Sequence, residues 1–265
     1  MIGIFDSGLG GLTVVRRVRE RLPHADLVFF ADQAHVPYGD RTPEDLDRLM
    51  RANVAWLDAR GVEAIVVGCN TSCAIADAYG WPESSAAIFD LIDSATIALQ
   101  RANARRIGIV ATAATVRSGA YGRRIREAIP QSEVWEVAAP ALVPLVEAGR
   151  IAGDEPRDAV ADVCTQLPRE LDAVVLACTH YPVLAEHFTA ALGAGVRQID
   201  PAFVQADRVA ALVESRGHAD ERGTTRYVTN GDVALFRHNV ARITNETNPL
   251  VEESAALAFE LDGRA

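Results

Sequence analysis

Two segments of the chain share one pattern, and each ends with a cysteine followed by polar residues. Residues 63–71 have the sequence EAIVVGCNT, and residues 172–180 have the sequence DAVVLACTH. In both, an acidic residue precedes a short apolar run, and a small residue separates that run from Cys69 or Cys178. Short apolar runs with such boundaries are typical of buried strands. The pattern predicts two similar halves, each with a thiol at a strand end, so that one ligand could be reached from two sides.

The similarity extends beyond the cysteines. Residues 2–7 (IGIFDS) resemble residues 107–112 (IGIVAT), and residues 26–40 resemble residues 133–147. In the second pair, Val-Pro at 36–37 aligns with Val-Pro at 143–144. The offset grows from 105 to 109 residues along the chain, as small loop insertions would produce. We interpret the chain as a duplication of one unit; two copies do not make a solenoid.

Composition limits the classes of function. The chain has 265 residues, 49% of them hydrophobic, and a formal net charge of −10. This charge argues against general binding to nucleic acids or acidic membranes, because the long-range field would repel them. No signal-peptide pattern and no apolar run of membrane-spanning length is evident, so we expect a cytoplasmic protein with no membrane association. Its four cysteines are then expected to be reduced thiols.

Short apolar runs alternate with amphipathic stretches almost throughout the chain. This alternation predicts an α/β fold of two pseudo-symmetric, doubly wound halves with mainly parallel sheets and an active site in the cleft between them. We expect one domain from residues 1–95 plus 208–265 and a second from residues 96–207. The nine strands that the pattern predicts are 2–5, 27–31, 64–68, 87–89, 107–111, 134–138, 173–177, 197–199 and 226–229.

Cys69 and Cys178 are the candidate catalytic residues. Each is expected at a strand end beside a helix N-terminus, where exposed N–H groups favour negative charge. An ordinary thiol with a pKa of about 8.5 is only about 3% ionised at pH 7, so a pKa lower by one to two units would make a useful base. The alternative is that both are small buried residues. Cys73 and Cys164 occupy helical, apolar positions and are expected to pack in the core.

The segment 6–11 (DSGLGG) joins the first strand to the first helix. Its glycines allow backbone N–H groups to approach a phosphate or a small carboxylate, although no complete nucleotide-binding motif is present. Asp6 could cap the helix or face the cleft as a proton acceptor or ammonium partner. His180, the one histidine next to a candidate thiol, could assist it or serve only structurally. Glu147 follows an apolar run, so burial could raise its pKa, or it could cap a helix.

Six motifs together resemble those of one family. FDSGLGGLTV, VPYGDRT, CNTS, ATAATVRSGAY, LVPLVEAG and LACTHYP are similar, in order and spacing, to the motifs of cofactor-independent glutamate racemases in the aspartate/glutamate racemase superfamily. The resemblance covers residues 1 to about 200. It implies an isomerase that interconverts L- and D-glutamate without cofactor or metal and supplies D-glutamate for peptidoglycan, and hence for cell-wall biogenesis and cell shape. It also implies a homodimer in the bacterial cytoplasm.

The resemblance also implies roles for individual residues. Cys69 matches the thiol that deprotonates the D-enantiomer, and Cys178 matches the thiol that deprotonates the L-enantiomer. Asp6, His180 and Glu147 match the groups that assist them. The residues that match substrate-binding positions are Asp6, Ser7, Pro37, Tyr38, Gly39, Asn70, Thr71, Thr112, Thr115, Thr179 and His180.

The segment 87–95 (AIFDLIDSA) departs from the family pattern, with Asp90 in place of a glycine and Ser94 in place of a proline. Ala139 replaces a common cysteine, and Cys73 follows CNTS in place of a smaller residue. Other hypotheses therefore stay open: a racemase or isomerase for aspartate or another small acid, a non-catalytic amino-acid-binding paralogue, and, more distantly, a redox or zinc protein.

Overall fold

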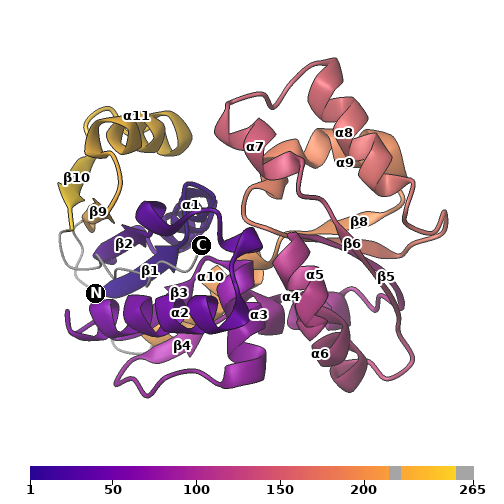
Figure 1. Ribbon diagram of the computed structural model, residues 1–265. Helices are drawn as coiled ribbons and strands as arrows, with labels where there is room; N and C mark the ends of the chain where they lie inside the picture. The colour runs from indigo at the N-terminus through magenta and orange to yellow at the C-terminus, as the bar shows by residue number, and fades with distance from the viewer. Residues whose placement is uncertain (215–221, 255–265) are drawn as a thin grey trace.

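Two parallel β-sheets form the centre of the computed structural model, which describes residues 1–214 and 222–254 (Figure 1). The first sheet has the strand order β10-β9-β2-β1-β3-β4, and the second has the order β6-β5-β7-β8. We call the sheets and their covering helices the first and second halves. The strands are β1 (Ile2–Asp6), β2 (Leu27–Ala31), β3 (Ala64–Val67), β4 (Ala87–Phe89), β5 (Arg106–Ala111), β6 (Glu133–Ala138), β7 (Ala173–Ala177), β8 (Arg197–Ile199), β9 (Thr225–Thr229) and β10 (Leu250–Glu253).

Helices cover both faces of these sheets. The α-helices of the described ranges are α1 (Gly11–Arg21), α2 (Pro43–Asp58), α3 (Asn70–Tyr79), α4 (Leu91–Arg101), α5 (Ala113–Ser118), α6 (Ala120–Ala128), α7 (Leu142–Glu147), α8 (Asp154–Cys164), α9 (Ala185–Leu192), α10 (Pro201–Glu214) and α11 (Val233–Thr244). Short 3₁₀ turns are η1 (Gln33–His35), η2 (Tyr38–Asp40) and η3 (Tyr181–Leu184). Because helices lie on both faces, β1, β2, β3 and β7 are buried along their whole length and have apolar runs without alternation.

The internal repeat is confirmed in the order of the strands. In the first half the strands run β2-β1-β3-β4, and in the second half the corresponding strands run β6-β5-β7-β8. Register agrees as well, since Ile2 pairs with Leu27 and Ala64 while Ile107 pairs with Val134 and Ala173. The predicted fold class and all nine predicted strands are therefore present. The sequence analysis missed β10, which extends the first sheet beyond β9.

The helices α4 and α10 join the two halves. α10 packs mainly against α1 and α4, and both α4 and α10 contact the second sheet at β7. The division into residues 1–95 plus 208–265 and 96–207 therefore stays a prediction, because these two helices belong to the packing of both halves. Residues 215–221 and 255–265, which that prediction placed in the first half, lie outside the described residues.

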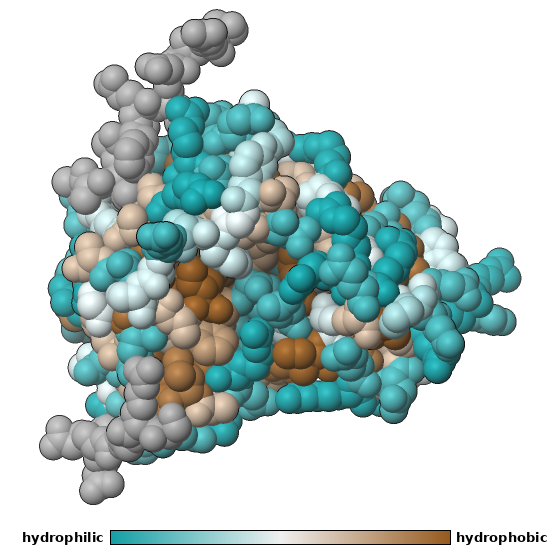
Figure 2. Space-filling view, turned by 90° about the horizontal axis from the view of Figure 1, so that it is seen from below, coloured by the Kyte–Doolittle hydropathy of each residue, from teal (hydrophilic) through white to brown (hydrophobic). Residues whose placement is uncertain are grey.

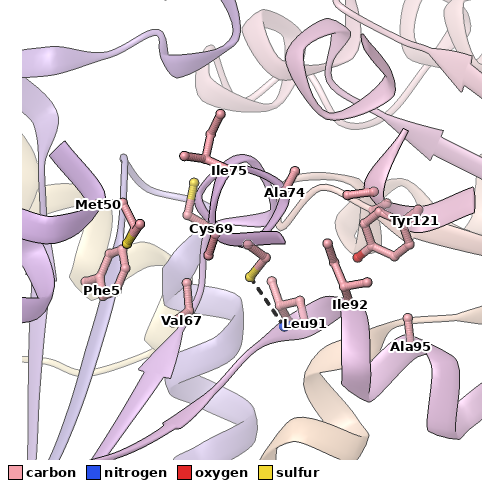
Figure 3. Packing of buried hydrophobic residues seen from close by; sticks show 14 of the residues in the cluster. Phe5, Met50, Val67, Cys69, Ala74, Ile75, Leu91, Ile92, Ala95 and Tyr121 are labelled. Atoms are coloured by element: carbon pink, nitrogen blue, oxygen red, sulfur yellow. Dashed lines mark hydrogen bonds between the residues drawn. The ribbon is translucent and has the colours of Figure 1, made fainter. Parts of the chain in front are cut away.

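One apolar cluster extends from the first sheet into the second. It includes Phe5 of β1, Ile92 of α4, Tyr121 of α6 and Ile109 of β5. Figure 3 shows part of this cluster around α3, with Cys69 above Val67 where β3 gives way to the helix. Close packing across the boundary transmits strain and resists independent movement. We infer that the geometry of a site between the halves is maintained by this shared core.

Hydrophobic residues form separate groups among hydrophilic ones on the face shown in Figure 2. Within residues 1–214 and 222–254, no helix combines the length and the apolar character needed to cross a bilayer.

Gln205 of α10 makes two hydrogen bonds to the first sheet, and their loss can be tested. Its side chain is fully buried, and its Nε2 donates to the backbone oxygens of Val67 and Phe89, the last residues of β3 and β4, at 3.0 and 2.8 Å. Gln205→Ala would leave two buried carbonyl groups without this donor, so the free energy of unfolding should fall by about 2–4 kcal/mol. Urea unfolding with an unchanged m-value would measure the loss.

Asp207→Ala is the matched control, because Asp207 is exposed on the same helix and, among the residues that the structure describes, pairs with Arg21 at the surface. It should leave the urea midpoint nearly unchanged. Equal midpoints for Gln205→Ala and the control would contradict the role given to Gln205.

Candidate active site

A cavity of about 360 Å³ lies between the two halves at the carboxyl ends of their central strands. Asp6 ends β1, Cys69 follows β3, Thr112 follows β5 and Cys178 follows β7. Loops after parallel strands meet at such an edge, and the duplication places one edge opposite the other. The volume is at the lower end of the range typical of small-molecule sites, which suits a small ligand.

Almost all of the predicted site residues line this cavity. They are Asp6, Ser7, Pro37, Tyr38, Gly39, Cys69, Asn70, Thr71, Thr112, Glu147, Cys178, Thr179 and His180. Thr115 is the exception, since its side chain is fully buried behind the wall. There its Oγ1 lies 3.0 Å from Thr112 Oγ1 and 3.4 Å from Thr71 Oγ1. Thr115 therefore forms hydrogen bonds with two hydroxyl groups of the cavity wall and does not face the ligand itself.

Cys69 lies at the N-cap position of α3, with extended backbone angles and a nearly buried side chain. Its Sγ is 3.9 Å from Ser7 Oγ. Burial, followed by the negative charge of Asp6, raises the pKa of the Cys69 thiol to about 12. A lowered pKa is therefore wrong for the Cys69 thiol, because desolvation and a neighbouring carboxylate outweigh the effect of the helix N-terminus. At neutral pH Cys69 is a protonated thiol.

Asp6 both accepts a hydrogen bond at the start of α1 and faces the cavity. Its Oδ2 accepts from the backbone N–H of Gly11 at 2.5 Å, at the start of α1, and from Thr179 Oγ1 at 3.5 Å. The residue also lines the cavity beside Cys69. Burial raises the pKa of Asp6, and the positive charge of His180 partly offsets this effect. Asp6 thus links the first half, the second half and the cavity.

Cys178, His180 and Glu147 form a connected chain on the opposite side of the cavity. Cys178 Sγ lies 3.6 Å from His180 Nδ1, and His180 Nε2 lies 3.2 Å from Glu147 Oε1. Burial by itself lowers the pKa of His180, but the hydrogen bonds with Cys178 and Glu147 and the charges of Cys178 and Asp6 raise it to about 10 overall. At neutral pH a positively charged imidazolium therefore lies beside Cys178.

The two thiols thus have opposite electrostatic surroundings within one cavity. Cys69 adjoins the carboxyl group of Asp6, whereas Cys178 adjoins the imidazolium of His180. An imidazolium stabilises negative charge on the neighbouring sulfur, and a buried carboxylate opposes it. The two sulfur atoms of the cavity therefore have neighbours of opposite charge.

Donors for anionic groups surround the thiols. The N-terminus of α3 presents the backbone N–H groups of Asn70 and Thr71, two residues that line the cavity, whereas the N–H of Ser72 is directed to Cys69. Hydroxyl groups of Thr71 and Thr112, 3.2 Å apart, lie on the same wall. These groups can bind carboxylates despite the negative net charge of the protein.

The turn η2 closes one end of the cavity. The hydroxyl of Tyr38 donates to Asp32 Oδ2 at 2.5 Å and accepts from Asn53 Nδ2 at 3.1 Å. Arg117 of α5 donates to the backbone oxygen of Gly39 at 3.1 Å. The Val36–Pro37 peptide bond at the start of this turn is cis. The turn is thus held from both halves.

The sequence analysis missed part of the lining, most of it apolar. The additional lining residues are Val36, Asp40, Ala113, Pro140, Val143 and Pro144. A signal was available, because both aligned Val-Pro pairs of the repeat, at 36–37 and 143–144, line the cavity. Equivalent positions in the two halves therefore enclose the ligand from both sides.

The unusual segment 87–95 does not line the cavity. Asp90 caps α4 by accepting from the backbone N–H of Asp93 at 2.8 Å, and Ser94 is fully buried. The segment therefore offers no physical reason for an altered ligand pocket. Cys73 is buried on α3, and its Sγ accepts from the N–H of Leu91 at 3.4 Å (dashed line in Figure 3); Cys164 is also buried. Both agree with core packing.

The raised pKa of His180 predicts a specific pH dependence. Its pKa in the folded protein, about 10, lies above the ordinary value of 6.5. The stability that protonation contributes is therefore fully present below about pH 6.5 and is lost as the pH rises through about 10. Proton NMR of the imidazole ring should show a titration midpoint near 10, with the resonance assigned by its absence in His180→Asn. A midpoint near 6.5 would show that the hydrogen bonds of His180 with Cys178 and Glu147 do not raise the pKa of its imidazole.

Comparisons with known proteins agree with this geometry. A family model described as Asp/Glu/hydantoin racemase matches residues 12–209. The chain is 41% identical over 237 residues to a glutamate racemase of Gloeobacter violaceus, covering 89% of each protein. It is 34% identical over 241 residues to a glutamate racemase of Levilactobacillus brevis, covering 89% of this chain and 87% of the relative.

Solved structures show the same fold. A glutamate racemase from Francisella tularensis, crystallised in complex with D-glutamate, aligns with a TM-score of 0.88 at 25% identity, covering 97% of this chain and 98% of that one. The glutamate racemase from Thermus thermophilus in complex with β-chloro-D-alanine aligns with a TM-score of 0.83 at 34% identity, covering 96% of each chain. Since the family model and these relatives span most of the sequence, the chain belongs to the Asp/Glu/hydantoin racemase family.

Proposed function

We propose that this protein is a glutamate racemase that interconverts L- and D-glutamate by proton transfer at the α-carbon between two opposed thiols. The observation that carries the proposal is that Cys69 and Cys178, at matching positions of a duplicated fold, line the same small cavity. The two relatives described above, which bear the name glutamate racemase, support the choice of substrate over aspartate or another small acid.

Substrate binding uses the donors around the thiols. The N–H groups at the start of α3 and the hydroxyls of Thr71, Thr112 and Thr179 receive the two carboxylates of glutamate. Asp6 faces the same cavity and provides a carboxyl group beside Cys69 that can pair with the substrate ammonium. Fixing the α-carbon between the two sulfur atoms converts a slow encounter into a reaction within one complex.

The different neighbours of the two thiols assign their parts in the first step. With L-glutamate bound, the Cys178 thiolate, stabilised by His180, removes the α-proton, and the Cys69 thiol donates its proton to the opposite face of the carbanion. D-glutamate results, with Cys69 left as a thiolate and Cys178 as a thiol. The reverse reaction begins from that state. Each step transfers one proton, and no atom is gained or lost.

Stabilisation of the carbanion is the largest energetic demand. An α-hydrogen of an amino acid is only weakly acidic, so fixed donors in a site shielded from water must stabilise the developing negative charge. Glu147 supports the imidazolium of His180 on one side, while Asp6 adjoins the thiol on the other. We assign Asp6, His180 and Glu147 to assisting proton transfer at the two sulfur atoms.

The product suggests the biological setting. D-glutamate is a component of peptidoglycan, so we place the enzyme in cell-wall biosynthesis in the cytoplasm. The family resemblance further supports a homodimer, and analytical ultracentrifugation of the purified protein would test that assembly.

Substitution of either cysteine tests the mechanism. Cys69→Ser and Cys178→Ser should each lower racemisation at least about a thousandfold, because a serine hydroxyl cannot replace a thiol as acid or base at neutral pH. Circular dichroism at a fixed wavelength follows the change in ellipticity as L- and D-glutamate interconvert, with either enantiomer as the starting substrate.

Cys164→Ser is the control, since Cys164 is a buried cysteine that does not line the cavity. Its rate should stay within about twofold of the wild type. Turnover close to normal in Cys69→Ser or Cys178→Ser would refute the assignment of that thiol.

A further inference from the structure

Tyr121 makes a contact with the cavity wall that the proposed mechanism does not use. It lies on α6 in the second half, fully buried, and its hydroxyl is 2.5 Å from Oδ1 of Asn70. Asn70 is the first residue of α3 in the first half and lines the cavity next to Cys69. The hydrogen bond therefore crosses from one half to a ligand-facing side chain of the other.

The distance determines which end of the Asn70 amide meets Tyr121. A separation of 2.5 Å is typical of an O–H donor and an oxygen acceptor, and it is shorter than an N–H donor normally makes. Burial, followed by the charge of Cys73, raises the pKa of Tyr121 well above 10, so its hydroxyl stays protonated and donates. The Oδ1 atom of Asn70 is thus occupied on the side away from the cavity.

The other end of the amide is left for a ligand. Within residues 1–214 and 222–254, Asn70 Nδ2 has no hydrogen-bond partner in the protein. The atom is also not fully buried, so a ligand can reach it. An NH₂ group donates two hydrogen bonds and accepts none. It therefore complements a carboxylate, whereas the amide oxygen in the same place would repel one.

We propose that Tyr121 is a positioning residue that fixes the Asn70 amide with its NH₂ group toward the cavity, where it donates to a carboxylate of the substrate. The inference rests on the proposed function, since it requires an anionic amino acid in the cavity. It adds to that function a residue outside the cavity that determines the orientation of a binding group.

Packing holds Tyr121 in place. In Figure 3 its ring lies beside Ile92 of α4, in the apolar cluster that both halves share. Such a ring cannot move away without opening a cavity in the core. The hydroxyl therefore has a fixed position, and the amide of Asn70 adopts the orientation that this position allows.

Tyr121→Phe removes only the hydroxyl and tests the proposal. With the amide free to rotate, KM for glutamate should rise about tenfold, while kcat should stay within about threefold. The control is Tyr227→Phe, because Tyr227 is also fully buried and its hydroxyl donates to Glu246 Oε1 at 2.5 Å in the first half. The control should lose a comparable hydrogen bond and keep both kinetic constants. Equal kinetics of the two variants would overturn the proposal.

A double-mutant cycle separates positioning from general loosening of the fold. If Tyr121 acts through Asn70, then adding Tyr121→Phe to Asn70→Ala should cause no further rise in KM. Additive effects would show that the hydroxyl acts in another way. Wild-type protein that does not racemise glutamate would instead reject the proposed function, so the two failures are distinguishable.

Asn70→Asp gives a second test that leaves the packing of Tyr121 intact. One carboxylate oxygen accepts from Tyr121, and the other replaces the NH₂ group in the cavity. The added negative charge should then raise KM at least tenfold above that of Asn70→Ala. A KM equal to or below that of Asn70→Ala would show that the NH₂ end does not face the substrate.

Discussion

The close approach of the two halves at Gly10 is the constraint on which the site depends. A Cβ atom at this position would lie 2.3 Å from Thr179 Oγ1 and 2.6 Å from His180 Nδ1, so only glycine allows α1 to begin this near the second half. Thr13 of α1 adds a hydrogen bond from its hydroxyl to the backbone oxygen of Thr179 at 3.1 Å. Because of this contact, Asp6 and His180 belong to one cavity although they come from different sheets.

Duplication explains why the chemistry is two-sided, and local differences explain why it is not symmetric. The two copies place Cys69 and Cys178 at the same point of the same strand order. The neighbours then differ: a buried carboxyl group beside Cys69 keeps that thiol protonated, and an imidazolium beside Cys178 favours negative charge there. In the proposed mechanism, the duplicated fold thereby supplies an acid and a base of the same chemical type.

The repeat made much of the site predictable from the sequence. The strand ends at Asp6, Cys69, Thr112 and Cys178 can be predicted from the apolar runs that precede these residues. The aligned Val-Pro pairs of the repeat would also have located the apolar wall of the cavity. Two features depend on tertiary packing and leave no such pattern. The raised pKa of Cys69 arises from burial, and the place of Thr115 behind the wall arises from how α5 sits on α3.

Elements outside the repeat were harder to predict. The strand β10 has only four residues, and two of them, Leu250 and Glu253, are exposed. Its pairing with β9 is decided by the sheet edge available to it and not by its own sequence. The contact between Tyr121 and Asn70 likewise joins residues 51 positions apart on two helices, a relation that no local spacing indicates.

The origin of the proton delivered to the product tests the central claim most directly. L-glutamate is incubated with the enzyme in deuterium oxide, and both enantiomers are separated early in the reaction and analysed by mass spectrometry. Two opposed thiols predict deuterium at the α-carbon of the D-glutamate formed, while the remaining L-glutamate keeps its hydrogen. Equal deuterium in both enantiomers from the first turnovers would mean that one group serves both faces, and would contradict the account.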